Sequence, residues 1–334
     1  EVIRLMGNGI NLGNTLEAYN HKSYVELGVD PTSFETLWGQ PVTTRDMIDD
    51  MKAMGFDTLR IPVAWTNGIN YESGDYTIDE RLMNRVDEVV NYALDADMYV
   101  ILNEHWDGSW WGMFGSADEA VREKGMALYK SMWTQISEHF SDYSYKLIFE
   151  SANEELCHRL NDSDVTGTEG VLSEDECYET TNRINSEFVK LVRSTGGKNA
   201  DRFLLIAGYN TDFRKTCDDR YQMPEDTAKD KLLLSVHYYT PWDYCSDGNA
   251  KRWGTPGDYE EQNSLFQMLT KFTDLGYGVV IGEYAVMGAA DKPDRDKFYA
   301  NLLDNCDLYN YCPVLWDCSD FYKRVLRKTT DENI

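Results

Sequence analysis

Eight short apolar runs alternate with helical patterns along the chain, and this alternation constrains the fold more than any other feature. Most of the runs are rich in Ile, Leu and Val without polar alternation, as expected for parallel strands that are covered on both faces. The runs occupy residues 9–12, 58–61, 99–102, 146–149, 203–207, 232–236, 279–281 and 313–315. The helical patterns occupy residues 44–54, 79–94, 118–140, 173–192, 259–275 and 294–303, with only a weak helical stretch between 207 and 232.

Eight strand units, most of them followed by a helix, predict an α/β fold that is a single (β/α)8 TIM barrel. The 334 residues suffice for this barrel as one catalytic domain, residues 1–334, because such barrels typically need about 250 residues. A doubly wound sheet would have fewer strands and usually a GxGxxG phosphate turn, which the sequence lacks. The sequence contains no linker, repeat or low-complexity segment that would indicate a second domain.

The net charge of −26 and the lack of long apolar runs exclude several classes of partner. Nucleic acid binding needs Lys and Arg for the phosphates, and anionic membranes are equally disfavoured. No apolar run approaches the ~18 residues of a membrane span. A neutral polymer is indifferent to this charge, which also keeps a protein soluble. The chain opens at Glu1 with no initiator Met or apolar segment, so we expect that processing or truncation removed what came before.

Seven Cys residues fit no zinc-type spacing, and their odd number does not make a disulfide framework. Cys306 and Cys312 flank an expected helix-to-strand turn and could pair in an oxidising compartment. Buried free thiols are the alternative, and the sequence leaves both open.

Polar residues follow nearly every apolar run, at the strand ends where (β/α)8 barrels carry their active sites. Polar side chains directly after buried strands are costly unless they face a site. Strand 5, which ends in Gly208 and Tyr209, is the clear gap. The residues at the other strand ends are Asn14, Arg60, Asn103, Glu104, His105, Glu150, Asn153, Glu154, Glu155, His237, Tyr239, Glu283, Tyr284, Trp316 and Asp317. Three further residues are expected on the surface: His21, His139 and His158.

Two of these carboxylates, Glu154 after strand 4 and Glu283 after strand 7, predict glycoside cleavage. The two strands lie roughly across the barrel, so one carboxyl group can protonate the leaving oxygen while the other attacks the sugar carbon. Glu150 lies inside or near its strand, so we expect it to pair structurally. Glu155 is expected to point away, because neighbouring residues leave a strand end on different sides.

Two other chemistries fit the sequence less well. Metal-dependent hydrolysis on this fold usually needs clustered His ligands, such as an HxH after strand 1, and no His follows that strand. A serine nucleophile would need a GxSxG elbow, which is also missing. We therefore expect neither a metal nor another cofactor.

Aromatic residues gather in the loops expected around the barrel mouth. Indole rings offer sugars an apolar face to stack on, so several of these residues are expected to line a sugar cleft. They are Trp38, Trp106, Trp110, Trp111, Trp242, Trp253 and Trp316.

The sequence resembles glycoside hydrolase family 5 of clan A, and within it the branch called subfamily 4. The resemblance spans almost the whole chain in the order of the family. Its motifs are INLGNTLEA (10–18), LWGQP (37–41), MGFDTLRIPVAW (54–65), YVILNEHW (99–106), KLIFESANE (146–154), VHYYTPW (236–242), VIGEY (280–284) and VLWD (314–317).

This resemblance implies a role for each matching residue. Glu154 corresponds to the acid/base and Glu283 to the nucleophile of a retaining, two-step reaction. Arg60 corresponds to the support of the nucleophile, and the remaining matches contact the substrate or the two carboxylates: His105, Asn153, His237, Tyr239 and Trp316. Rim residues expected to contact substrate are Asn14, Trp38, Trp106 and Trp242.

Two electrostatic expectations follow from these positions. Arg60 should pair with Glu283 and favour its ionised form, and the Tyr239 hydroxyl should steady the same carboxylate. Glu154 faces a negative neighbour, so its pKa is expected to be raised for its role as an acid.

The resemblance also implies endo-acting cleavage of β-1,4-glucan backbones: cellulose-like glucan, mixed-linkage glucan or xyloglucan, with xylan and mannan as side activities. It implies a secreted protein, or one attached to the cell surface through carbohydrate-binding or scaffold-docking modules not present here. Trp106, Glu155 and Cys318 depart from the usual His, Pro and Asn of relatives. The alternatives are a non-catalytic carbohydrate-binding barrel and an exo-acting or transglycosylating relative.

Overall fold

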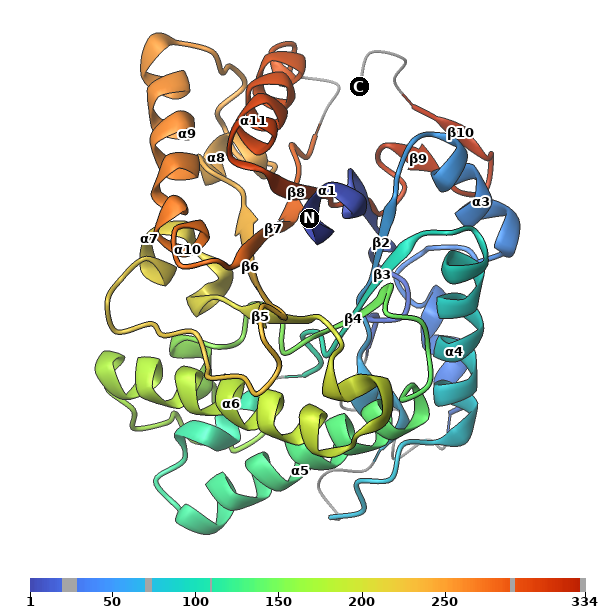
Figure 1. The fold of residues 1–334 in the computed structure, drawn as a ribbon, viewed down its shortest axis with the longest axis vertical. Helices are drawn as coiled ribbons and strands as arrows, with labels where there is room; N and C mark the ends of the chain where they lie inside the picture. Colours follow the sequence, from blue (N-terminus) through green and yellow to red (C-terminus); the bar gives the residue numbers. More distant parts are fainter. Residues whose placement is uncertain (20–28, 70–73, 109, 289–291, 331–334) are drawn as a thin grey trace.

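The computed structural model describes residues 1–19, 29–69, 74–108, 110–288 and 292–330. Eight parallel strands close into a barrel in chain order, and β8 returns to pair with β1 (Figure 1), which confirms the predicted (β/α)8 fold. The strands are β1 (Gly9–Asn11), β2 (Thr58–Ile61), β3 (Tyr99–Asn103), β4 (Leu147–Glu150), β5 (Leu204–Ala207), β6 (Leu232–Tyr238), β7 (Gly278–Tyr284) and β8 (Tyr311–Leu315).

Helices surround the barrel and begin at capping side chains that the sequence supplies. Thr44, Asp79 and Ser173 each accept a hydrogen bond from the first turn of the following helix, which satisfies a backbone donor that the helix leaves free. The helices are α1 (Val2–Met6), α3 (Arg45–Ala53), α4 (Glu80–Asp95), α5 (Glu119–His139), α6 (Glu174–Ser194), α7 (Phe213–Thr216), α8 (Trp242–Cys245), α9 (Pro256–Met268), α10 (Thr270–Thr273) and α11 (Arg295–Tyr309).

These helices match the sequence patterns with two qualifications. The pattern at 259–275 is divided into α9 and α10, and the weak stretch after β5 contains only the single turn of α7. Short 3-10 helices occupy several loops, at Pro31–Thr36, Trp65–Gly68, Trp110–Gly115, His158–Asn161, Gly197–Ala200 and Tyr209–Thr211. Within the described residues, no helix has the length and apolar character needed to cross a membrane.

The amino ends of the strands are closed by α1, a helix that the sequence pattern did not reveal. Its buried residues Ile3 and Met6 pack against side chains from the interior of the barrel, and Ile3 lies close against Gly278 at the start of β7. The interior partners are Ile101, Ile148, Leu205, Leu233, Val280, Cys312 and Val314. With this end filled, the carboxyl ends of the strands remain as the open face of the barrel.

The pairing of β6 with β7 is irregular at that open face. The register shifts between Val236 and His237, so that His237 lies opposite Glu283. Irregularities of this kind re-aim side chains and are frequent beside active sites. Gly282 sits at the shift, where an added Cβ would lie 3.1 Å from the His237 ring.

A hairpin follows the last barrel strand and was not predicted, because its strands are too short to show a period. It consists of β9 (Tyr322–Lys323) and β10 (Lys328–Thr329), paired antiparallel. The hairpin is bound to the outside of α3 through Arg327, which donates to Asp50 at 2.7 Å and to Asp46 at 3.0 Å.

All seven Cys residues are free thiols, so the pairing considered for Cys306 and Cys312 is absent. Both side chains are buried, and burial raises the pKa of the Cys312 thiol to about 12. A buried thiol with a raised pKa reacts slowly, because the thiolate is the reactive form. The alternative of buried free thiols therefore describes most of the seven.

Arg202 is a buried cation that joins the end of α5 to the strands on the amino side of the barrel. Burial lowers the pKa of its guanidinium to about 10. Its side chain donates to Phe140 O (3.1 Å), Tyr143 O (3.0 Å), Ser144 O (2.7 Å), Leu147 O (2.9 Å) and Asn199 Oδ1 (2.9 Å).

We predict that Arg202→Met lowers the free energy of unfolding by about 3 kcal/mol, since it removes four side-chain hydrogen bonds to backbone carbonyls. Arg45→Met is the control, because the Arg45–Asp95 pair is exposed to water, which screens it, so its loss is expected to lower stability much less. Urea unfolding of both variants measures the difference, and equal losses would contradict the assignment.

Candidate active site

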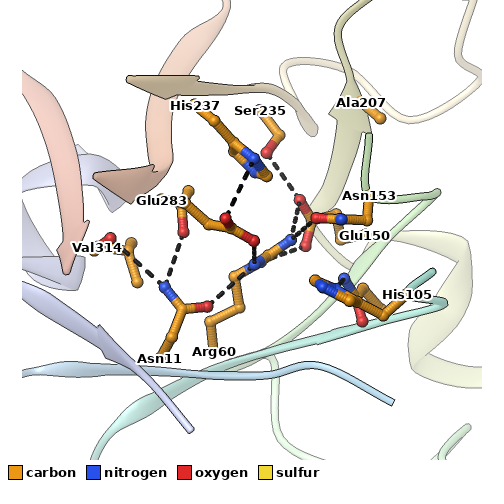
Figure 2. A network of polar contacts seen from close by, with 12 residues as sticks. Asn11, Arg60, His105, Glu150, Asn153, Ala207, Ser235, His237, Glu283 and Val314 are labelled. Atoms are coloured by element: carbon orange, nitrogen blue, oxygen red, sulfur yellow. Dashed lines mark hydrogen bonds and ion pairs between the residues drawn. The ribbon is translucent and has the colours of Figure 1, made fainter. Parts of the chain in front are cut away.

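The guanidinium of Arg60 occupies the centre of the open face, where Figure 2 shows it surrounded by acceptors from other strands. Its Nε lies 2.7 Å from Glu150 Oε2, and its Nη1 lies 2.8 Å from Glu283 Oε1. Nη1 also donates to Asn11 Oδ1 at 3.0 Å, and Nη2 donates to Asn153 Oδ1 at 2.9 Å. Residues from β1, β2, β4 and β7 thus meet at one buried charge.

Burial opposes the charge of Arg60, but two carboxylates compensate for it. The guanidinium is fully buried, and the negative charges of Glu150 and Glu283 outweigh desolvation and raise its pKa. Glu150 also accepts a hydrogen bond from Ser235 Oγ at 2.7 Å. Glu150 therefore pairs structurally, as expected from its place in the strand.

Both oxygens of the Glu283 carboxylate are held by donors. Arg60 binds Oε1, and the Tyr239 hydroxyl donates to Oε2 at 2.8 Å. Burial and the charges of Glu283 and Glu154 raise the pKa of Tyr239 well above its usual value, so the phenol keeps its proton. The expected contacts of Arg60 and Tyr239 with this carboxylate are both present.

Glu154 is the more accessible of the two carboxylates, with 31% of its side chain exposed. His237 lies between the two acids, since its Nδ1 is 3.1 Å from Glu154 Oε1 and 3.6 Å from Glu283 Oε2. Burial raises the pKa of Glu154. The hydrogen bond and charge of His237, together with the charges of Arg159 and Arg60, lower it by more, so the net shift is downward. The expectation of a raised pKa is therefore wrong for the free protein, because the contact with His237 and the charges of Arg159 and Arg60 outweigh the effect of burial.

The two carboxylates are close enough for a direct displacement. One oxygen each from Glu154 and Glu283 and one ring nitrogen of His237 all lie within 4.8 Å of one another. A separation near 5 Å is typical of retaining glycosidases, whereas inverting enzymes need about 6.5–9.5 Å.

The same three atoms have a spacing that could also hold a cation. Glu283 fits this function poorly, because both of its oxygens already accept hydrogen bonds from Arg60 and Tyr239. The adjacent guanidinium charge would also repel a cation. The donors around Glu283 therefore favour a free carboxylate over a metal ligand.

His105 faces the same space as a neutral ring. Burial and the charge of Arg60 lower its pKa to about 3. The Asn103 side-chain amide contacts its Nδ1 at 3.0 Å, which assigns the ring proton to Nε2. Its ring is nearly parallel to the indole of Trp316, at 12° and a centroid distance of 6.1 Å.

The tryptophans divide into rim and interior residues. Trp38 and Trp242 are 42% and 63% exposed, and Trp106 and Trp316 are partly exposed. The other three, Trp110, Trp111 and Trp253, are buried in the core, so the expectation of a sugar cleft does not extend to them.

Three of the rim tryptophans also contact neighbouring side chains. The Trp38 indole packs edge-on against Tyr19, and Trp242 packs edge-on against Tyr239. The guanidinium of Arg159 lies 4.9 Å from the centre of the Trp106 ring. These three rim indoles therefore come from the loops that follow β1, β3 and β6.

Asn14 lies in a turn at the end of β1, where its backbone has a positive φ of 56°. Its backbone N–H donates to the carboxylate of the buried Glu17. Among the surface histidines, His139 and His158 are exposed and His21 lies outside the described residues.

Sequence reasoning missed Asn11, which orients Arg60. Its side-chain amide donates to Gly282 O at 3.0 Å, and its oxygen accepts from Arg60. The available signal was a single Asn inside an otherwise apolar run. Ser235 in β6 carried the same signal.

A second group of carboxyls, Glu104, Asp107 and Glu155, lies buried behind the site. Glu155 accepts the backbone N–H of Asn153 at 2.9 Å, so it is directed away from the open face as expected. Burial raises the pKa of Glu155 to about 8 and that of Asp107 to about 6, and it raises the pKa of Glu104 further. Adjacent Glu154 and Glu155 thus differ in ionisation because their surroundings differ.

Comparison with known proteins places this geometry in a family. The family model described as cellulase, glycosyl hydrolase family 5, matches residues 22–321. Endoglucanase A of Paenibacillus barcinonensis is 34% identical over 93% of this chain and 80% of its own length. A xyloglucan-specific endo-β-1,4-glucanase of Bacteroides ovatus is 31% identical over 98% of this chain and 66% of its length. The chain spans only 59% of Endoglucanase A of Clostridium longisporum, at 37% identity.

Solved structures agree with the sequence relatives. A family 5 lichenase of a Caldicellulosiruptor species, determined with cellotetraose, superposes with a TM-score of 0.87 at 30% identity, covering 100% of this chain and 92% of that one. A subfamily 4 broad-specificity endoglucanase from a bovine rumen ciliate gives 0.84 at 33% identity, covering 99% and 94%.

The buried carboxyls predict how stability depends on pH. The pKa of Glu155 is about 8 in the folded chain against a usual 4.5, so unfolding releases its proton between these values and stability falls as pH rises through that window. Glu155→Gln cannot titrate, and it should flatten the slope by at most about 1.4 kcal/mol per pH unit.

Urea unfolding between pH 5 and 8.5 measures this slope. Glu138→Gln is the control, because Glu138 is an exposed acid on α5, and this variant should keep the slope of the wild-type chain. A Glu155→Gln variant whose stability falls with pH as steeply as that of the wild type would show that Glu155 ionises normally when folded.

Proposed function

The chain belongs to glycosyl hydrolase family 5, the cellulase family, and from this premise we propose that it cleaves internal bonds of β-1,4-glucan backbones with retention of configuration. The observation that carries the proposal is the pair of carboxylates within 4.8 Å, of which one is accessible and the other is held by Arg60 and Tyr239. A non-catalytic barrel would have no use for this arrangement.

In the first step Glu283 attacks the sugar carbon and the bond to the leaving sugar breaks. Arg60 and Tyr239 aim the carboxylate and leave its charge available, and Glu154 gives its proton to the departing oxygen. In the second step Glu154 takes a proton from water, which displaces Glu283 from the sugar. Two displacements at one carbon restore its original configuration.

His237 opposes the rise in the pKa of Glu154 that substrate binding brings about. In the free chain its contact helps to keep the pKa of Glu154 low. Substrate in the cleft excludes water from Glu154, which strengthens the effect of burial and raises that pKa toward the value an acid needs.

The substrate is a neutral glucan polymer. A net charge of −26 disfavours acidic polysaccharides, and the exposed indoles of Trp38 and Trp242 offer stacking faces beyond the reacting sugar. Relatives include endoglucanases and a xyloglucan-specific enzyme, and a related lichenase was determined with cellotetraose. Cellulose-like, mixed-linkage and xyloglucan backbones are the candidates, with xylan and mannan as side activities.

We also propose that the protein acts outside the cell, either secreted or attached to the surface. Glucan polymers are too large to enter a cell intact, so an enzyme that cuts their interior must meet them outside. Since the chain spans 59% of one relative, carbohydrate-binding or scaffold-docking modules beyond these 334 residues fit the same function.

The role of Glu154 is tested by replacing it with Gln. Hydrolysis of a soluble β-glucan should fall by about 10²–10⁴-fold, because its leaving sugar needs a proton. An activated aryl β-cellobioside should still show a burst of phenol release, since its leaving group needs little protonation. Rapid-mixing kinetics on both substrates separate the two steps.

Glu155→Gln is the matched control, being the neighbouring acid on the same strand end. It should retain hydrolysis of both substrates within a few-fold at a pH where it is folded. If Glu155→Gln showed the burst and Glu154→Gln did not, the acid/base would be Glu155.

The stereochemical course tests the role of Glu283. Proton NMR of the first product released from a β-glucan should show the β-anomer, and excess EDTA should leave the rate unchanged. Early release of the α-anomer would make Glu283 a general base for water, and loss of activity with EDTA would indicate a metal at the three-residue cluster.

A further inference from the structure

The backbone carbonyl of Asp317, the residue after Trp316, is held by two donors from different loops. The carbonyl oxygen of Asp317 accepts the backbone N–H of Gly13 at 2.9 Å and the Nη2 of Arg324 at 2.7 Å. Trp316 itself makes the last backbone bond to the barrel, from its N–H to Tyr284 O at 2.9 Å. Beyond that bond, these two donors hold the backbone next to the indole.

The same guanidinium also binds the turn after β1. Nη1 of Arg324 donates to Gly13 O at 3.1 Å and to Thr15 Oγ1 at 2.7 Å. The side chain is fully buried, and the Asp317 carboxylate lies 3.9 Å away. One arginine therefore joins the first and last loops of the open face, which are over 300 residues apart in sequence.

Gly13 is the residue of this turn that lies against the Trp316 indole. A Cβ added at Gly13 would lie 2.9 Å from Trp316 Cζ2 and 2.7 Å from Asp317 O, so only glycine allows the indole to lie this close to the backbone. A shift of the Gly13–Thr15 turn would move the edge against which the Trp316 ring lies. The position of the ring thus depends on the turn that Arg324 holds.

Arg324 lies in the β9–β10 hairpin, whose other side is bound to α3. Asp317 Oδ1 accepts the N–H of Phe321 at 2.8 Å, one residue before β9 begins. Arg327 ties the outside of the hairpin to Asp50 and Asp46 on α3. The hairpin therefore has an outer attachment through Arg327 and an inner one through Arg324.

We propose that Arg324 is a positioning residue for the reaction, which fixes the Trp316 indole against the reacting sugar by joining the Asp317 carbonyl to the Gly13–Thr15 turn. The proposal rests on the proposed function, because it assumes that a sugar stacks on Trp316. The planar fork of arginine suits this task, since it aims two nitrogens at acceptors on both loops, which a lysine ammonium cannot reproduce.

The test compares Arg324→Met and Arg324→Lys with Arg327→Met, which loosens only the outer attachment. Misplacing a group that contacts the reacting sugar costs up to about 10²-fold in rate. We expect Arg324→Met to lower kcat on a soluble β-glucan by about 10–100-fold with a smaller change in KM, and Arg324→Lys to lie between it and the wild type. Arg327→Met should stay within about two-fold at a temperature where circular dichroism shows all three to be folded.

A double-mutant cycle with Trp316→Ala separates positioning from a general structural role. If Arg324 acts through the indole, Arg324→Met should cost less than about two-fold in kcat when Trp316 is already removed. An unchanged cost in the Trp316→Ala background would overturn the proposal, as would equal kinetic losses in Arg324→Met and Arg327→Met.

A measurement without substrate tests the structural part of the proposal separately from the proposed function. The Gly13 amide should exchange its hydrogen faster in Arg324→Met than in the wild type and Arg327→Met, because the variant loses the guanidinium that holds the Gly13–Thr15 turn and the Asp317 carbonyl together. Unchanged exchange would overturn the proposal even in an active enzyme. A wild-type chain that hydrolyses no β-glucan would instead contradict the proposed function, and the exchange would still decide whether Arg324 holds the turn.

Discussion

The buried charge of Arg60 is the constraint on which the open face of the barrel depends. A guanidinium removed from water is stable only where acceptors surround it, and here Glu150, Glu283, Asn11 and Asn153 supply them. Each acceptor is attached to a different part of the barrel wall or its rim, so the charge requires a closed barrel and the closed barrel supplies the acceptors. The ion pair between Arg60 and Glu283 therefore both stabilises the barrel and orients the Glu283 carboxylate.

Neighbouring acids in this protein acquire opposite properties from their surroundings. Glu154 is directed toward His237 and has a lowered pKa, whereas Glu155 is buried behind the site and keeps its proton to about pH 8. The side chain is the same, but the number of cations and of hydrogen-bond donors around it differs. Burial alone raises both pKa values, and only Glu154 has enough positive charge nearby to reverse that effect.

The features that could be predicted from the sequence are those that depend on a local residue pattern or on a position along a strand. The eight strands and the helices begun by Thr44, Asp79 and Ser173 follow from apolar runs and capping residues, and the contact of Arg60 with Glu283 followed from their strand ends together with the family resemblance. The short α1 and the β9–β10 hairpin have too few residues to show a period. The orientation of Asn11 and the burial of Trp110 depend on partners that only the folded chain brings together. The predicted rise in the pKa of Glu154 was wrong for the same reason, since the fold brings His237 from β6 and Arg60 from β2 close to it.

The pairing of β1 with β8, together with the bonds of Arg324, has a consequence for the order in which the molecule is made. A chain emerging from the ribosome carries Glu154 and most of the barrel long before residues 311–324 appear. Until then the sheet has two open edges, which are prone to pair with other chains. The indole of Trp316 also lacks its support during this time. Synthesis therefore passes through a nascent intermediate that contains both acids but lacks β8 and Trp316, and the support for the indole arrives only with residues 311–324.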